Sequence, residues 1–478
     1  MKRFFSSFGM APWGLTIFAV MITAFLLYKS SLNYFFFQDD FFEINISKAH
    51  NVADYLNFFK FRNDIIAYRP ISLQTYFFTS SQIFGFNAGG FRVITFTFLF
   101  ASYLLLAKII EKITKSKLIA FTTASLWLLS SIHFMAITWI AAAYNIIGTS
   151  FWFMTSYLFL RYIDSQNKKY YLLSLIAFLL TIGSFEFSIT WPAIFGVYYL
   201  IVLKKGFQKS IKTFLPFAII SAIYLVLRLY LIKVPQILEY KTTFNIDSIK
   251  ALFWYFLWTF NIPEEFKKQI VTKLLIFNPK FLNEYWQLVV ETFGAALVII
   301  TLGIITPVIN LIRKKRSGDL QILLFAAAWF VIGISPVLVL PNHTFTMYLT
   351  LASIGIYFLI SYLLVRSGLE KLIAPLIIIW ILSSLVTLSF YRENSWMVES
   401  QRFASSFYLQ IKQEYPILPH NSQVYYPLTD HRYLQALLGN NAIQAIYNDP
   451  TLSIYYNKVS LMEFWRQNPH QSKIYIPK

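Results

Sequence analysis

The chain contains no cysteine among its 478 residues, and only 13% of its residues are charged. The lack of cysteine excludes a disulfide framework, a thiolate metal site and a cysteine nucleophile. It is compatible with exposure to an oxidising compartment. A soluble domain of this length would carry roughly 25% charged residues. The sequence therefore excludes an ordinary soluble globular protein.

Several motifs of soluble enzymes are also absent from the sequence. There is no Walker loop, no dinucleotide-binding glycine pattern, no HExxH and no G-x-S-x-G, and we find no internal repeat. A nucleotide-driven reaction is therefore unsupported. The energy for any synthesis must come from the substrate itself.

Apolar and aromatic residues dominate the chain instead. It is 57% hydrophobic and 19% aromatic, with 49 Phe and 31 Tyr, and its mean hydropathy is +0.55. A membrane span needs about 20 apolar residues, and aromatic residues collect at membrane interfaces. The sequence predicts an all-α polytopic membrane protein with 11 spans. The predicted spans lie near residues 11–29, 91–110, 118–134, 146–162, 170–187, 188–203, 213–232, 287–312, 320–340, 346–365 and 372–391.

The basic residues predict the topology of these spans. The net charge of +19 lies mostly in short runs between spans, where it sets orientation and does not indicate nucleic-acid binding. With an odd number of spans, every run falls on the side of Lys2 and Arg3. We therefore expect an uncleaved first span, a cytoplasmic N-terminus and an extracytoplasmic C-terminus in a bacterial cytoplasmic membrane. The basic runs are 108–117, 161–169, 204–212, 313–316 and 366–371.

Three larger segments then lie on the outer side. Residues 31–90 and 233–286 are loops of a membrane domain that spans 1–391, and 392–478 form a polar tail. In the second loop, Ala251–Phe260 is too short to span and is interpreted as an interfacial or re-entrant helix. The tail carries strand-like runs at 423–426 and 473–476 between prolines, and it is long enough for a small extracytoplasmic α/β domain.

An acidic cluster follows the first span. Asp39 and Asp40 are adjacent, Glu43 is three residues further on, and aromatic residues surround them. At least one pKa in the cluster is expected to be raised, because neighbouring like charges resist joint ionisation. A carboxyl group there suits acid–base chemistry on a lipid-linked substrate. The alternative is a solvated start to an ordinary loop.

Other polar residues fall at the outer ends of predicted spans. Arg69 precedes a proline, and its planar guanidinium could bind a phosphate. The alternative is that Arg69 only extends its charge to the membrane interface. Glu186 needs a cationic partner, and Arg228 is the available one, in a catalytic or a purely structural pair. His133 and His343 also lie at this side, where a lone histidine is usually a packing residue. Together these residues predict a polar cavity at the outer leaflet.

Five segments resemble, in order, motifs of the GT-C superfamily of polyprenyl-phosphate-sugar glycosyltransferases. The similarity runs from about residue 30 to 400 and favours the branch of the protein O-mannosyltransferases and the transmembrane, TPR-bearing O-mannosyltransferases. The segments are Asp39-Asp40-Phe41, Tyr68-Arg69-Pro70-Ile71-Ser72, His133-Phe134-Met135-Ala136-Ile137-Thr138-Trp139, Ser184-Phe185-Glu186-Phe187-Ser188-Ile189-Thr190-Trp191-Pro192 and Met347-Tyr348-Leu349-Thr350-Leu351-Ala352-Ser353-Ile354-Gly355.

The sequence departs from the family pattern at charged positions. Met135 stands in place of Glu, Phe185 in place of Lys and Met347 in place of Arg, while Ala143 and Asn145 replace a charged pair. No TPR array follows the membrane part. These departures leave the sugar and the acceptor unspecified.

The resemblance implies glycosyl transfer on the outer membrane face. A polyprenyl-phosphate sugar would be the donor, and a protein, lipid or polysaccharide hydroxyl the acceptor. Asp39 or Asp40 would be the general base of an inverting displacement, and Arg69 and Arg228 would stabilise the leaving phosphate. The resemblance implies no cofactor, and a divalent metal is allowed but not required.

Three alternatives to a glycosyltransferase remain open from the sequence. A transporter or flippase for a lipid-linked oligosaccharide predicts paired repeats and charges at mid-membrane depth, and the sequence shows neither. An oligosaccharide polymerase predicts basic residues concentrated in outer loops. The lost family charges also leave open a non-catalytic accessory subunit.

Overall fold

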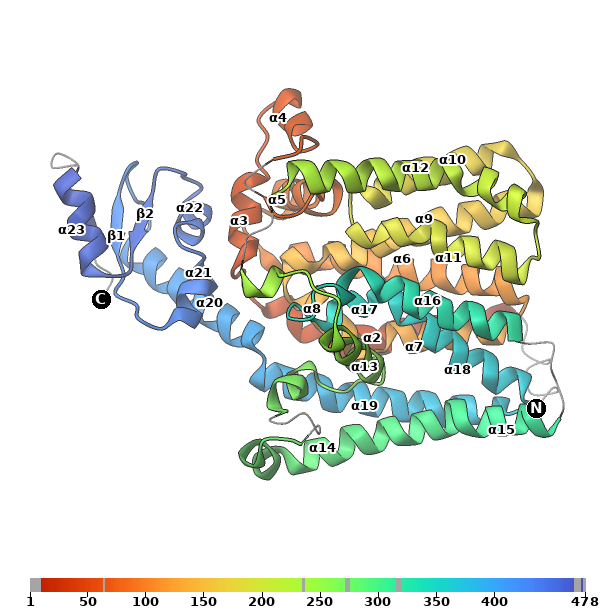
Figure 1. Ribbon diagram of the computed structural model, residues 1–478. Coiled ribbons are helices and arrows are strands. Elements are labelled where there is room, and N and C mark those ends of the chain that lie inside the picture. Colours follow the sequence, from red (N-terminus) through yellow and green to blue (C-terminus); the bar gives the residue numbers. More distant parts are fainter. Residues whose placement is uncertain are drawn as a thin grey trace.

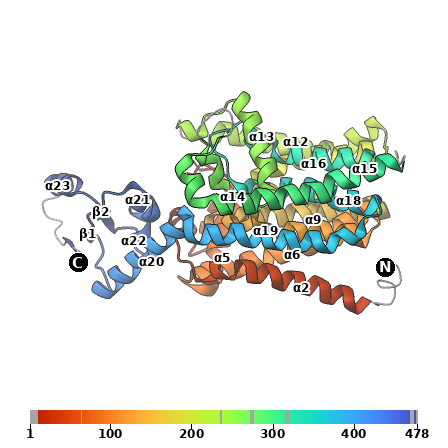
Figure 2. The same ribbon diagram turned by 90° about the horizontal axis from the view of Figure 1, so that it is seen from below.

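The computed structural model describes residues 10–62, 65–233, 237–270, 276–314, 320–467 and 474–475. Within them the protein is a bundle of long, roughly aligned helices, with a smaller mixed unit attached at one end (Figures 1 and 2). The basic residues Lys2, Arg3, Lys315 and Arg316 lie outside the described residues.

Helices occupy all eleven places where a span is expected. The long ones are α2 (Met10–Tyr28), α6 (Ala88–Thr114), α7 (Lys117–Leu128), α9 (Tyr144–Ser165), α10 (Lys168–Ile182), α12 (Phe207–Leu231), α14 (Pro279–Ile300), α16 (Leu320–Leu338), α18 (Ile354–Arg366) and α19 (Ile373–Asn394). Shorter pieces complete them: η3 (Ser131–His133), α8 (Phe134–Thr138), η4 (Ile140–Ala142), η5 (Glu186–Thr190), α11 (Trp191–Val197), η6 (Tyr198–Val202), η9 (Thr301–Ile305), α15 (Thr306–Arg313), η10 (Thr346–Tyr348), α17 (Leu349–Ala352) and η11 (Glu370–Leu372).

Helix length and composition identify fewer spans than the sequence predicts. Among the described residues, 6 helices are long and apolar enough to cross a membrane, or up to 8 if each of two bent pairs is one span. The bends are 47° between Lys117–Leu128 and Ser131–Thr138, and 52° between Thr346–Ala352 and Ile354–Arg366. The many-spanned helical fold is therefore confirmed, and the count of 11 stays a prediction.

Short turns between neighbouring helices follow from local sequence. Lys115 ends α6 in the left-handed conformation, and the side chain of the next residue, Ser116, accepts a hydrogen bond from the first turn of α7. Gln166 and Asn167 do the same between α9 and α10. A left-handed residue satisfies the end of one helix and a Ser or Asn cap satisfies the start of the next. Two residues therefore suffice to reverse the chain.

All the described basic runs lie at one end of the bundle. They connect α6 to α7, α9 to α10, η6 to α12 and α18 to η11, and another lies at the end of α15, on the side where the N-terminus is marked in Figure 1. At the opposite end are α3 (Asp39–Ile46), α4 (Val52–Asn57), α5 (Tyr76–Phe84) and α13 (Ile246–Trp258). α13 covers most of the short helix expected in the second outer loop.

The tail forms the mixed unit at that opposite end. It begins with α20 (Trp396–Glu414) and continues with α21 (His431–Leu437), α22 (Asn441–Tyr447) and α23 (Lys458–Gln467). Three parallel strands, in the order β2-β1-β3, form its sheet: β1 (Gln423–Tyr425), β2 (Ser453–Tyr455) and β3 (Ile474–Tyr475). β1 and β3 fall in the two runs expected to be strands.

A reporter fusion tests the orientation. An enzyme that is active only outside the cytoplasm, fused after Lys478, is expected to be active, because the tail lies at the end opposite the basic runs. The same reporter fused in the turn at Gly206 is the matched control and should be inactive. An inactive fusion at Lys478 with normal expression would contradict the predicted topology.

Candidate active site

Two segments far apart in sequence bring Arg69 and Glu186 together. Arg69 precedes η2 (Pro70–Thr75), whose Ile71 N–H donates to Gly183 O at 3.1 Å. The hydroxyl of Ser72 donates to Ser184 O at 2.6 Å. These two bonds fix η2 against the break that follows α10, and Glu186 leaves that break as the first residue of η5. The position of both charged residues is therefore set by backbone contacts.

A glycine in α9 permits this break to approach closely. A Cβ at Gly148 would lie 2.3 Å from Cβ of Phe185, so the two elements meet only because this residue has no side chain. Phe185 stacks on Phe187 at 4.8 Å, and Phe187 stacks on Tyr348 at 5.4 Å. The residue before Glu186 is thus held in a row of aromatic rings.

The Arg69–Glu186 ion pair is the centre of the site. Arg69 Nε donates to Oε1 and Oε2 of Glu186 at 3.0 and 2.9 Å, and the two side chains are 17% and 15% exposed. The Arg69 guanidinium lies 3.3 Å from the ring centroid of Tyr144, a cation–π contact. Both hydrogen bonds leave from Nε, so neither terminal nitrogen is engaged by Glu186.

This arrangement corrects one expectation from the sequence. The sequence predicts Arg228 as the partner of Glu186, but the ion pair forms with Arg69. Arg228, in the last turns of α12, acts on Glu186 only through its electrostatic field. The pairing could not be read from the sequence because Arg69 and Glu186 are 117 positions apart.

Asp39 and Asp40 stand in different environments although they are adjacent. Asp40 is fully buried; its Oδ1 accepts from Ala141 N at 2.7 Å and its Oδ2 from Phe37 N at 3.2 Å. Asp39 is partly exposed, and in the described part of the chain its side chain has no hydrogen bond. Asp40 therefore ties two backbone segments together, and Asp39 is the carboxyl group free to act on a ligand.

Burial is the main reason that the carboxyl pKa values rise. It raises the pKa of Asp39 to about 6, against the opposing charge of Arg69. It raises the pKa of Asp40 to about 7, and Arg92 and two backbone N–H groups oppose the rise. Burial followed by the charge of Asp39 raises the pKa of Glu43 to about 8. The expected rise is confirmed, but desolvation outweighs the like-charge repulsion from which it was inferred.

The sequence places Phe91-Arg92-Val93 at the opening of a span that follows the family-like Tyr68–Ser72 run, but it gives Arg92, in the first turns of α6, no role at the site. Its side chain is fully buried and donates to Tyr34 O at 2.5 Å, Thr138 O at 2.7 Å and Ile137 O at 3.2 Å. Arg92 thereby joins the first outer loop to α8, the short helix that follows the bend after α7. An arginine near the start of an apolar helix is energetically costly. That cost could have indicated from the sequence alone that Arg92 has buried polar partners.

The two histidines occupy different places. His133 is buried, its Nε2 bonds to Trp127 O at 2.8 Å, and its ring meets Trp127 edge-on at 4.6 Å. These contacts fit the packing alternative. Around His343 the rings of Tyr240 and Phe345 each lie 4.8 Å away. Burial, and then the charge of Arg69, lowers the pKa of His343 to about 4, so this imidazole is neutral beside Arg69.

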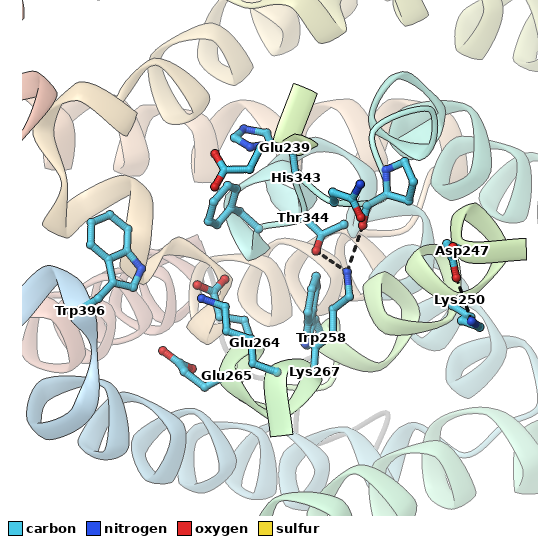
Figure 3. A pocket seen from close by; sticks show the side chains of 14 residues that line it. Glu239, Asp247, Lys250, Trp258, Glu264, Glu265, Lys267, His343, Thr344 and Trp396 are labelled. Atoms are coloured by element: carbon cyan, nitrogen blue, oxygen red, sulfur yellow. Dashed lines mark hydrogen bonds and ion pairs between the residues drawn. The ribbon is translucent and has the colours of Figure 1, made fainter. Parts of the chain in front are cut away.

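A cavity of about 490 Å³ adjoins this cluster (Figure 3). His343 lies at one part of its wall and Trp396 at another. Trp396 contacts Phe37, with ring centroids 6.1 Å apart, two residues before Asp39. The charge of Asp39 acts on Tyr240, next to the cavity-lining Glu239. The acidic segment therefore reaches the cavity through Trp396, and its charge acts on a residue next to the cavity wall, Tyr240.

The C-terminal unit contacts the acidic segment directly. Gln38 has φ +52°, a strained conformation for a residue other than glycine, and its N–H donates to Ala436 O at 2.8 Å. Phe35 N donates to Gln401 Oε1 at 3.1 Å, and Asn45 Nδ2 donates to Asn441 O at 2.9 Å. The segment that carries Asp39 is thus held on both sides by residues of the tail.

Replacing Gln401 by Ala tests this support. Phe35 N–H would lose its partner in a part-buried place, which costs about 1–3 kcal/mol. We expect a lower melting temperature and a lower turnover, with unchanged binding of a polyprenyl-phosphate ligand. Gln435→Ala, at an exposed position of α21, is the control. Unchanged melting and turnover for Gln401→Ala would contradict the proposed support.

Within the described residues, no three His, Asp or Glu side chains gather in a group that could hold a metal ion. Around Arg69 the structure gathers its ion-pair partner Glu186 and two groups on which its charge acts, Asp39 and His343. Arg228 adds positive charge, and His133 has the contacts of a packing residue.

One protein family matches the middle of the chain. The family model described as dolichyl-phosphate-mannose-protein mannosyltransferase matches residues 70–232. That range contains His133, Glu186 and Arg228 and excludes Asp39 and Asp40. No curated protein matches the chain significantly.

Solved structures resemble the chain over nearly its whole length. ArnT from Cupriavidus metallidurans in the apo state is 13% identical, with a TM-score of 0.51, and the match covers 96% of this chain and 89% of that one. The same protein bound to undecaprenyl phosphate is 11% identical, with a TM-score of 0.50 and coverage of 98% and 90%. Archaeal oligosaccharyltransferase AglB from Archaeoglobus fulgidus, in complex with an inhibitory peptide and a dolichol-phosphate, is 12% identical, with coverage of 94% and 64% and a TM-score of 0.47.

The identities are too low to transfer an activity, but the similarity to ArnT extends along nearly the entire helical bundle and tail. The family match lies within the same bundle. The resemblance seen in the sequence motifs is therefore confirmed at the level of the fold: this protein has the GT-C glycosyltransferase fold.

Proposed function

We propose that the protein is a membrane glycosyltransferase that transfers a sugar from a polyprenyl-phosphate donor to an acceptor hydroxyl. The observation that carries the proposal is a partly exposed carboxyl, Asp39, whose pKa the charge of the paired Arg69 lowers and whose segment contacts the cavity-lining Trp396 through Phe37. Helix α3, which begins at Asp39, lies at the end of the bundle opposite the basic runs (Figure 1). Support for the donor class comes from the fold shared with a protein solved with undecaprenyl phosphate bound.

The reaction is a single displacement with inversion. Asp39 takes the proton of the acceptor hydroxyl as its oxygen bonds to the anomeric carbon. The bond between that carbon and the phosphate oxygen breaks, and polyprenyl phosphate leaves with the bonding electrons. Arg69 stabilises the leaving phosphate through its terminal nitrogens, and Glu186 holds the guanidinium in place. Arg228 adds a second positive charge nearby.

Asp40 and Arg92 act indirectly in this proposal. Asp40 joins the segment before Asp39 to Ala141, and Arg92 joins the same segment to residues 137–138. A base must be held within hydrogen-bond reach of the proton that it removes. These buried contacts, with those of the tail, keep the Asp39 segment in one place.

The test uses purified full-length protein in detergent. It is incubated with a panel of polyprenyl-phosphate sugars and a mixture of protein, lipid and polysaccharide acceptors, and products are followed by mass spectrometry. Transfer from at least one donor, with an inverted anomeric configuration by NMR, is expected. Transfer with retention would refute the mechanism. No transfer and no binding of any polyprenyl phosphate would refute the function.

A further inference from the structure

Glu43 is a buried carboxyl group that the proposed reaction does not use. It lies on α3 four residues after Asp39, and only 7% of it is exposed. Residues four apart on a helix lie on the same face, so Glu43 and Asp39 share one side of α3. A carboxyl group is costly to bury and is kept where it has polar partners. The partners of Glu43 therefore indicate its role beside the proposed base.

A hydrogen bond between side chains joins Glu43 to η2. Gln74 Nε2 donates to Glu43 Oε2 at 3.3 Å, and Gln74 is 3% exposed. η2 begins directly after Arg69 and is itself hydrogen-bonded to the break that follows α10. The Glu43–Gln74 bond thus connects the helix that carries Asp39 to the element that follows Arg69.

The proposed displacement needs these two elements at a fixed separation. Asp39 must reach the acceptor hydroxyl while Arg69 binds the phosphate that leaves from the opposite side of the anomeric carbon. An error of about 1 Å in such a geometry can lower a rate roughly 100-fold. Since α3 and η2 are separate elements, the distance between the base and the arginine depends on the contacts that join them.

Glu43 forms this bond as a neutral group. Burial and the charges of Asp39 and Asp40 raise the pKa of Glu43 to about 8, against the charges of Arg69 and Arg62. The elements α5, η4 and α22 also pack on α3 and contain no Asp, Glu, Lys, Arg or His. The pKa of Asp39 is the lower one, about 6. At neutral pH the base is therefore ionised, while Glu43 adds no negative charge near Arg69.

A second hydrogen bond reaches η2 from the same outer loop. The hydroxyl groups of Tyr55, on α4, and Thr75, in η2, lie 3.3 Å apart. This bond does not involve α3. It holds η2 to a helix that carries no proposed catalytic group, and it therefore provides a comparison for the Glu43–Gln74 bond.

We propose that the Glu43–Gln74 hydrogen bond sets the separation between the base on α3 and the arginine that precedes η2. Glu43 and Gln74 are positioning residues, and neither touches the reacting atoms. The assignment rests on the proposed glycosyl transfer and adds two residues to its machinery. The proton of the acceptor still moves to Asp39, and no bond forms or breaks at Glu43.

Turnover and donor binding of three variants of the full-length protein in detergent test this role. Glu43→Leu and Gln74→Leu each remove the hydrogen bond and should lower kcat roughly 10- to 100-fold. The Kd of undecaprenyl phosphate should not change, because Arg69 keeps its bonds to Glu186. Glu43→Gln should keep kcat within about 3-fold of the wild-type value, because an amide donates and accepts hydrogen bonds as a neutral carboxyl does.

The opposite results are equally definite. An unchanged kcat in Glu43→Leu would overturn the proposal. A loss in Glu43→Gln as large as that in Glu43→Leu would also overturn it, because the reaction would then need the carboxylate charge. The double variant Glu43→Leu/Gln74→Leu should lose little more than either single variant, since the same bond is lost in all three. Additive losses would show that the two residues act separately.

Distance measurements test the same bond without a transfer reaction. The chain has no cysteine, so spin labels can be attached at Ile46→Cys, in the last turn of α3, and at Ile83→Cys, on α5 directly after η2. Ile83 is 63% exposed and Ile46 is partly exposed. Glu43→Leu should shift or broaden the distance distribution by roughly 1–2 Å, a displacement large enough to impair catalysis. Tyr55→Phe, which loses only the bond to Thr75, is the matched control and should leave the distribution unchanged.

The two kinds of measurement separate this proposal from the proposed reaction. An identical distance distribution in the wild type and Glu43→Leu, or an equal change in Tyr55→Phe, would overturn the positioning role whether or not the protein transfers sugar. Normal kcat in Glu43→Leu would leave the glycosyltransferase standing and remove this link. A distance change without transfer from any polyprenyl-phosphate donor would support the link and refute the reaction. Melting temperatures show which variants keep the fold, and Gln74→Leu replaces Glu43→Leu in both tests if the latter does not fold.

Discussion

Asp39→Asn is expected to lower turnover by about 10²- to 10⁴-fold, the usual contribution of a general base, while the protein folds normally. Asn is nearly the same shape as Asp but does not accept a proton at neutral pH. Asp39 is partly exposed, and the described structure gives its side chain no hydrogen bond, so little packing depends on its charge. Turnover with saturating donor and acceptor, together with the melting temperature, measures both parts of the expectation.

The pH dependence of turnover, compared between the wild type and Asp39→Asn, adds a second measurement. The pKa of Asp39 is raised to about 6, and a base works only when deprotonated. Turnover of the wild type should therefore fall as the pH drops through about 6 and should level off above it. The residual activity of Asp39→Asn should lack this step. A wild-type profile that is flat from pH 5 to pH 8, about one unit below and two above that pKa, would contradict the assignment.

Asp40→Asn is the matched comparison. Asp40 accepts hydrogen bonds from two backbone N–H groups, and an amide that replaces it turns one N–H₂ toward a donor. We expect a loss of stability of about 1–3 kcal/mol, seen as a lower melting temperature, and a smaller fall in turnover than in Asp39→Asn. If Asp40→Asn melts normally and loses more activity than Asp39→Asn, Asp40 is the base.

Arg69→Lys is expected to weaken binding of a polyprenyl phosphate by roughly 10- to 100-fold. Lysine keeps the positive charge but loses the planar guanidinium. In arginine, Nε bonds to Glu186, and in the proposed mechanism the terminal nitrogens bind the phosphate. Charge-assisted hydrogen bonds of this kind are worth about 1.5–3 kcal/mol. Binding is measured with undecaprenyl phosphate and the purified protein in detergent. Arg228→Lys, at a residue without an ion pair to Glu186 among the described contacts, should have the smaller effect.

Glu186→Gln removes the carboxylate that orients Arg69. Loss of one partner of a buried pair costs roughly 3–5 kcal/mol, and the remaining exposure of these side chains, 17% and 15%, places the expected loss at the lower end. The variant should melt at a lower temperature and should bind donor lipid as weakly as Arg69→Lys. A lower melting temperature with unchanged lipid binding in both variants would show that the pair is purely structural.

The sequence by itself determined the helical membrane bundle and its likeness to the GT-C family. Hydrophobic runs of membrane length are a local property, because each span must satisfy its own backbone in lipid. The helices accordingly occupy the predicted places, and the described basic runs gather at one end. Arg69 and Glu186 were also found as candidates, since an isolated charge beside apolar residues is costly wherever it lies.

Only the tertiary structure decided how these residues combine. Glu186 pairs with Arg69 because η2 is hydrogen-bonded to the break after α10, a contact between segments that no local pattern records. Asp39 and Asp40 have different environments because successive residues of a helix point about 100° apart, so the carboxyl of Asp40 faces the interior and that of Asp39 remains partly exposed. The cavity likewise forms where three distant segments meet, the second outer loop, residues 341–345 and the start of α20, and distance along the chain hides such sites from a single sequence.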